Sequence, residues 1–121
     1  MSYTVFEYLY RDASNYKAFG EVWLTGVIND NERSTIMRSF DSGEFFVAEQ
    51  VGIPPLYREL FEYSGGRTED DHAWHAFEAL RSEQNLSDDA EVWGTVSKLA
   101  AAFATAQRNW KPELSPNFVE W

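Results

Sequence analysis

The chain has 121 residues, of which 44% are hydrophobic and 17% are aromatic, and this suits one folded domain with one hydrophobic core. Twenty acidic residues against ten basic ones give a net charge of -10, which argues against direct binding to nucleic acid or to an anionic membrane. Since cysteine is absent, disulfides, cysteine nucleophiles, cysteine-ligated zinc and iron–sulfur clusters are excluded.

Two strands are expected at the beginning of the chain. Residues 3–10 (YTVFEYLY) are rich in aromatic and β-branched side chains, and strand alternation would put Phe6 and Tyr8 on one face and Glu7 on the other. A polar stretch follows at residues 12–15, and residues 18–28 again alternate apolar and polar side chains. The pattern predicts an antiparallel β-hairpin.

A helix and a short strand are expected next. Asn29 and Glu32 have the spacing of a capping box, and Gly43 can end a helix, so the sequence predicts a helix over residues 30–42. The apolar residues 44–48 predict a third, buried strand, and Pro55 can begin a short helix.

Residues 73–81 allow two interpretations. As a strand, they would place Phe77 and Leu80 on opposite faces; as a helix, they would place Trp74, Phe77 and Leu80 on one face. We favour the strand.

Residues 95–110 predict a second long helix. Val96, Leu99 and Phe103 recur at three- and four-residue intervals, and either Thr95 or Asp88 can serve as the N-cap. Together these elements predict an α+β fold for a single domain over residues 1–121. Its sheet would be mainly antiparallel, with about four strands and with helices packed on one face.

Acidic residues are concentrated between residues 69 and 91. This segment holds eight acids and one base, Arg81, and so carries -7 of the net charge of -10. If these acids lie in solvated loops or cap helices, their concentration here has no role in binding. Alternatively, the segment is an interaction surface for a basic partner, including the case in which carboxylates mimic the phosphates of nucleic acid. The candidate partner-binding residues are Glu69, Asp70, Asp71, Glu78, Glu83, Asp88, Asp89 and Glu91.

Both histidines of the chain follow a pair of carboxylates in the sequence DDHAWH. Asp71, His72 and His75 could bind a divalent metal ion or serve a hydrolytic enzyme, with a histidine as general base. On a strand, however, His72 and His75 would point to opposite faces. We therefore expect structural histidines, with His75 hydrogen-bonded, and neither metal nor cofactor. The sequence has no glycine-rich nucleotide motif and no serine-nucleophile motif.

Three stretches resemble a family of small bacterial proteins with no established activity: YLYRDASNYK at residues 8–17, FFVAEQVGIP at residues 45–54 and DDHAWH at residues 70–75. The resemblance spans most of the first eighty residues, implies a bacterial or phage origin and carries no catalytic assignment. In size and acidity the chain is also similar to phage inhibitors of bacterial defence, such as anti-CRISPR proteins and DNA mimics.

These observations predict a non-enzymatic acidic protein that binds a basic protein surface, in the form of an inhibitor of a nucleic-acid-binding machine. A small bacterial housekeeping or immunity-type domain is the alternative. A metal-binding or hydrolytic enzyme that uses Asp71, His72 and His75 comes third. The first residues lack the basic and apolar regions of a secretory signal, and no apolar run is long enough to cross a bilayer, so we expect a cytoplasmic protein.

Overall fold

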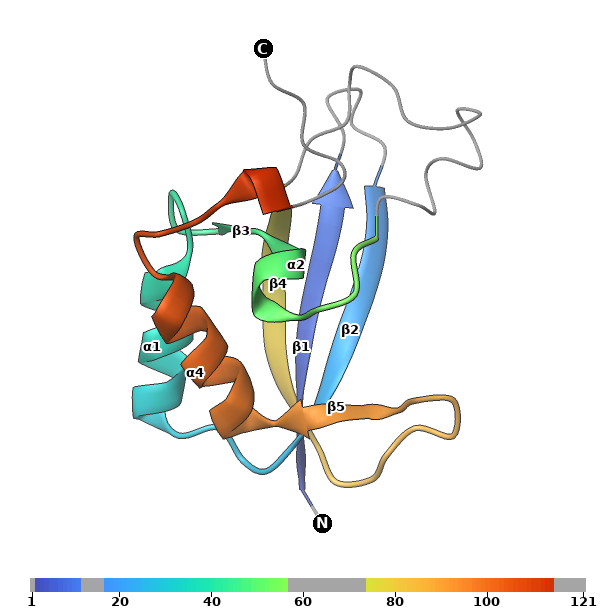
Figure 1. Ribbon diagram of the computed structural model, residues 1–121. Helices are drawn as coiled ribbons and strands as arrows, with labels where there is room; N and C mark the ends of the chain where they lie inside the picture. Colours follow the sequence, from blue (N-terminus) through green and yellow to red (C-terminus); the bar gives the residue numbers. More distant parts are fainter. Residues whose placement is uncertain (1, 12–16, 57–73, 115–121) are drawn as a thin grey trace.

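The computed structural model describes residues 2–11, 17–56 and 74–114 (Figure 1). Five strands form one sheet in the order β3-β4-β1-β2-β5. The strands are β1 (Tyr3–Arg11), β2 (Lys17–Thr25), β3 (Phe45–Phe46), β4 (His75–Glu83) and β5 (Val92–Thr95). The helices are α1 (Asp30–Ser39), α2 (Ala48–Val51), α4 (Val96–Ala106) and the 3-10 helix η1 (Pro112–Leu114).

The sheet confirms the predicted α+β fold. Strand β1 pairs antiparallel with β2 on one side and with β4 on the other, and β3 pairs antiparallel with β4. Only β5 runs parallel to its neighbour, β2. The described sheet has five strands where the sequence predicted about four, because β5 was missed. This strand is four residues long and contains Gly94, so it lacks the apolar alternation that reveals longer strands.

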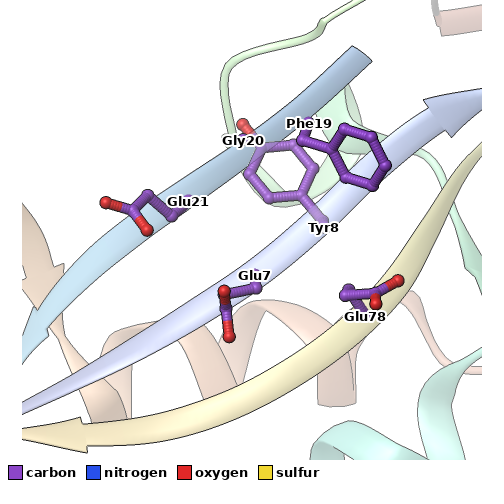
Figure 2. Close-up of a pocket in the computed structure, with 6 residues that line it drawn as sticks. All are labelled: Glu7, Tyr8, Phe19, Gly20, Glu21 and Glu78. Atoms are coloured by element: carbon purple, nitrogen blue, oxygen red, sulfur yellow. The ribbon is translucent and has the colours of Figure 1, made fainter. Parts of the chain in front are cut away.

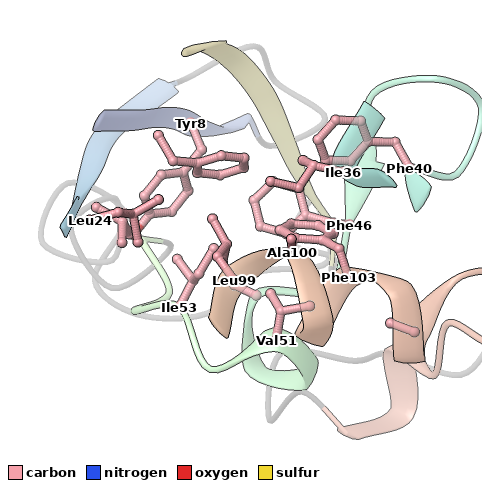
Figure 3. Close-up of a cluster of buried hydrophobic side chains, with 14 of the residues drawn as sticks. Tyr8, Leu24, Ile36, Phe40, Phe46, Val51, Ile53, Leu99, Ala100 and Phe103 are labelled. Carbon is pink, nitrogen blue, oxygen red and sulfur yellow. The ribbon is translucent and has the colours of Figure 1, made fainter. Parts of the chain in front are cut away.

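Helices α1, α2 and α4 pack on one face of the sheet, as predicted (Figure 1). Figure 3 shows side chains of α1, α2 and α4 in the same cluster as the inward-facing side chains of β1 and β2. On α4, the predicted residues Val96, Leu99 and Phe103 are all buried. Thr95 is the N-cap of this helix, since its side chain accepts a hydrogen bond from the backbone N–H of Lys98 at 3.0 Å.

Several predicted boundaries were wrong. Strand β2 ends at Thr25, before Gly26, whose φ of 104° is incompatible with a regular strand. Helix α1 has the predicted capping box but ends at Ser39, and α4 ends at Ala106. The predicted strand at residues 44–48 consists of the two-residue β3, followed directly by α2. The short helix predicted from Pro55 lies mostly outside the described residues.

The segment forms strand β4, as favoured, but the prediction of which of its side chains share a face was wrong. Glu7 of β1 pairs with Ala79 and the next residue, Tyr8, pairs with Phe77, so the pairing passes over Glu78. This β-bulge inserts one residue, and Phe77 and Leu80 therefore both pack against the core although they are three residues apart. The inserted residue also explains why the segment fitted a helical spacing.

Candidate functional site

The face of the sheet opposite the helices carries a group of charged side chains. Glu7 on β1 lies directly opposite Glu21 on β2, and the bulge places Glu78 of β4 beside them (Figure 2). Glu83, the last residue of β4, belongs to the same face and forms an ion pair with Arg81. We call the four residues Glu7, Glu21, Glu78 and Glu83 the acidic sheet face.

Arg81 is bound to three of these carboxylates. Its Nη1 atom lies 3.1 Å from Glu7 Oε1 and 3.0 Å from Glu21 Oε2, and its Nε atom lies 3.0 Å from Glu83 Oε1. Like charges that face each other across two strands repel. The Arg81 guanidinium between Glu7 and Glu21 offsets this repulsion. The four carboxylates of the acidic sheet face outnumber this one guanidinium, which contacts three of them. Arg11 and Lys17, which pair at the far end of β1 and β2, are the next basic residues on this side of the sheet.

Trp23 supports this arrangement from β2. Its ring is buried between Tyr3 and Arg81, whose guanidinium carbon lies 5.5 Å from the ring centre. The indole N–H donates a hydrogen bond of 3.0 Å to Glu21 Oε1. This bond is the largest cause that lowers the pKa of Glu21, and the nearby Arg81 lowers it further. Glu21 therefore stays charged at neutral pH.

Two shallow depressions lie on this face. The first, with a volume of about 200 Å³, is lined by Glu7, Tyr8, Phe19, Gly20, Glu21 and Glu78 (Figure 2). Phe19, at its rim, is 62% exposed. The second, of about 350 Å³, is lined by Glu21, Trp23, Asp89, Ala90 and Glu91. Acidic residues therefore continue from Glu21 of the acidic sheet face onto the connection between β4 and β5.

The predicted partner-binding residues are only partly brought together. Glu78, Glu83, Asp89 and Glu91 lie on or beside the acidic sheet face. Asp88 is exposed in the turn after β4 but lines neither depression. The hydroxyl of Ser87 donates to Asp89 Oδ1 at 2.7 Å, and this bond lowers the pKa of Asp89. Glu69, Asp70 and Asp71 lie outside the described residues.

Glu7 and Glu21 were not among the predicted site residues. The signal for them was present in the sequence, since each is the charged residue on the outward side of a strand in the predicted hairpin. Only the register, which sets Glu7 opposite Glu21, and the pairing of β4 beside β1 bring them to Glu78 and Arg81.

His75, from the third predicted function, is a buried residue. Its Nε2 atom accepts a hydrogen bond of 3.0 Å from the backbone N–H of Leu56, as expected for a structural histidine. His72 and Asp71 lie outside the described residues. In the part of the chain that the structure describes, no three histidine or carboxylate side chains are grouped so that they could hold a metal ion. No helix in that part is long and apolar enough to cross a membrane.

The fold and the acidic sheet face together define a small α+β protein with a charged sheet face on which none of the described helices packs. Comparison of the chain with protein-family models, with curated proteins and with solved structures gives no significant match.

The lowered pKa of Glu21 predicts a pH-dependent contribution to stability. A carboxylate whose pKa is lowered by folding stabilises the folded state fully above its ordinary value of 4.5, and this contribution is lost as the pH falls through the lowered value. We expect Glu21→Gln to lower the free energy of unfolding at about pH 6 but to have a smaller effect at about pH 3. Urea unfolding of the wild type and of Glu21→Gln at both pH values measures this change in the free energy of unfolding. Glu113→Gln, away from the sheet, serves as the control, and an equal effect of Glu21→Gln at both pH values would contradict the prediction.

Proposed function

We propose that this chain is a non-enzymatic interaction protein that binds a basic partner through the acidic sheet face. The observation that carries the proposal is the row of Glu21, Glu7 and Glu78 on three adjacent strands (Figure 2). Neighbouring strands are about 4.8 Å apart, so the row concentrates negative charge on a short stretch of surface. Surface charge of one sign steers a partner of opposite sign and sets the orientation in which it docks.

The exposed ring of Phe19 indicates which basic side chain the partner presents. An aromatic ring beside carboxylates suits arginine, whose guanidinium pairs with carboxylates and also stacks on rings. The chain already uses this combination internally, where Arg81 lies over Trp23 and contacts Glu21. An arginine-rich protein surface therefore fits the acidic sheet face better than a lysine-rich one.

In its finer form, the proposal is that the partner binds nucleic acid and that this protein inhibits it. Surfaces that bind nucleic acid are rich in arginine and lysine, because these side chains contact the phosphates. A row of carboxylates on a regular sheet supports phosphate mimicry, which needs acidic groups in line on one rigid surface. The protein would then occupy the basic surface in place of nucleic acid.

A triple variant tests the binding surface. We expect Glu7→Gln/Glu78→Gln/Glu83→Gln to bind a labelled arginine-rich peptide about tenfold more weakly than the wild type, because three ion pairs at the protein surface of about 0.5 kcal/mol each add up to such a factor. Fluorescence anisotropy at about 0.05 M salt measures the affinity. At about 0.5 M salt the difference is expected to shrink, since added ions screen exposed charges.

A matched control separates the surface from the net charge. The variant Asp30→Asn/Glu44→Gln/Glu113→Gln removes the same charge from exposed positions elsewhere and should bind nearly like the wild type. If it binds as weakly as the sheet variant, the acidic sheet face is not the binding surface. A third variant, Glu69→Gln/Asp70→Asn/Asp71→Asn, measures how much these three acids, which lie outside the described residues, contribute to binding.

The inhibitor form has its own test. Proteins captured from a bacterial lysate by the wild type, but not by the sheet variant, are purified and bound to a labelled DNA or RNA fragment. We expect this protein to displace the fragment. If the captured proteins do not bind nucleic acid, the inhibitor form is wrong, whereas binding of a basic partner is unaffected.

A further inference from the structure

Three side chains hold residues 52–56 against the sheet. The indole N–H of Trp93 donates to the carbonyl of Gly52 at 2.8 Å, and the hydroxyl of Tyr8 donates to the carbonyl of Pro54 at 2.6 Å. In the third contact the direction is reversed, since the backbone N–H of Leu56 donates to Nε2 of His75 at 3.0 Å. We call residues 52–56 the pinned segment.

The pinned segment contacts the sheet closely. Gly20 of β2 lies under the side chain of Leu56, and a Cβ atom on this glycine would come within 2.7 Å of Leu56 Cδ2 and 3.2 Å of Tyr8 Cζ. Ile53 and Leu56 are both buried in the core cluster. Release of the segment would therefore expose apolar side chains and uncover the inward face of β2.

His75 lies in an aromatic environment. His75 is 0% exposed. The centres of the Tyr8, Tyr10 and Phe46 rings lie 6.0, 5.2 and 6.0 Å from the centre of its imidazole ring. Tyr8 and Tyr10, on β1, are the titratable groups among these ring neighbours, and an ordinary tyrosine is uncharged below about pH 10. Phe46 of β3 and Leu56 of the pinned segment bring no charged side chain.

The hydrogen bond from Leu56 requires an uncharged imidazole. A backbone N–H can only donate, so Nε2 of His75 must offer its lone pair. In the imidazolium both ring nitrogens carry a proton, and the two N–H groups would face each other. The positive charge would also lie at a fully buried position, where ions are poorly solvated.

From this geometry we propose that His75 is an acid-sensitive switch whose protonation releases the pinned segment from the sheet. The switch does not depend on the acidic sheet face, which lies on the opposite side of the sheet. In the released state His75 reaches water and binds a proton with the pKa of an ordinary histidine, about 6.5. If the pinned state cannot bind this proton, lowering the pH from about 7.5 to about 5 raises the ratio of released to pinned molecules about thirtyfold.

Amide hydrogen exchange measured by NMR on the wild-type protein tests the switch. We expect the protection factor of the Leu56 amide, corrected for the intrinsic pH dependence of exchange, to fall about thirtyfold between about pH 7.5 and about pH 5. At both pH values the Leu56 amide should be less protected than the Leu99 amide in α4, because release of the pinned segment exposes Leu56 while α4 stays folded. Equal protection at the two amides would mean that Leu56 exchanges only when the whole domain unfolds, which would overturn the proposal.

Three variants assign the effect to one imidazole. His75→Gln keeps an acceptor for the Leu56 amide but does not titrate, so its protection should not depend on pH. His72→Gln removes the other histidine of the chain and should behave like the wild type. Tyr8→Phe removes the hydrogen bond to Pro54 and should lower protection by the same factor at both pH values.

A direct titration keeps the proposal testable even if His75→Gln does not fold. The ring protons of His75 in the wild type report when it becomes charged. We expect His75 to become charged together with the loss of protection at Leu56. A charged His75 with a protected Leu56 amide, or pH-dependent protection that persists in His75→Gln, would show that there is no such switch.

Discussion

Replacing Leu99 by alanine is expected to lower the free energy of unfolding by about 2–5 kcal/mol. Leu99 is 0% exposed on α4, and Figure 3 shows its side chain between Val51 and Ile53 on one side and the sheet on the other. The truncation removes buried methyl groups and leaves a cavity that the surrounding helices and strands fill only in part. Because a domain of this size is stable by about 5–15 kcal/mol in total, the loss is a large fraction of its stability.

Urea unfolding of the wild type and of Leu99→Ala measures this loss. Leu114→Ala is the matched control, since the same substitution is made at a leucine that is 55% exposed on η1. We expect the control to change stability by about 0.5 kcal/mol or less. Equal effects of the two substitutions would contradict the placement of Leu99 in the core.

Elements set by local sequence signals could be predicted. The capping box of α1 forms because Asn29 and Glu32 are three residues apart, and both of its hydrogen bonds are present. The buried stripe of α4 follows from its helical spacing, and the β1–β2 hairpin follows from two alternating runs separated by polar residues. Each signal lies within one segment and needs no knowledge of the rest of the chain.

Elements that depend on a distant partner could not be predicted. Strand β5 is defined by its pairing with β2, more than sixty residues earlier in the sequence. The bulge in β4 is visible only in its register against β1, and without it Phe77 and Leu80 fall on opposite faces. Tertiary contacts decide such features, whereas local propensity carries little information about them.

The candidate site shows the same division. A count of charges along the chain found Glu78 and Glu83, because they belong to an acidic segment. Glu7 and Glu21 each stand alone in the sequence, and they join the site only because three strands lie side by side. Arg81 counted as one base among eight acids, yet it is the residue that holds three carboxylates of the acidic sheet face together.

Strand β3 has only two residues and exists because of its packing. Phe46 is 0% exposed, and its ring lies between 5.5 and 6.0 Å from the rings of Phe6, Tyr8, Phe40, His75 and Phe103. These neighbours come from β1, β4 and α4 and from the residue that follows α1. Phe46 therefore joins the sheet to the helices at the centre of the core.

Phe46→Ala is accordingly expected to lower the free energy of unfolding by about 3–5 kcal/mol, because it removes a large buried ring together with its contacts to five neighbouring rings. Phe45→Ala, at the adjacent residue, is the matched control: Phe45 is half-buried and lines a shallow depression with Asp41, Ser42 and Trp74. Partial burial of a ring predicts a loss of about 1 kcal/mol for this variant. Urea unfolding of both variants gives the comparison. If Phe45→Ala is as destabilising as Phe46→Ala, strand pairing rather than the aromatic core holds β3 in place.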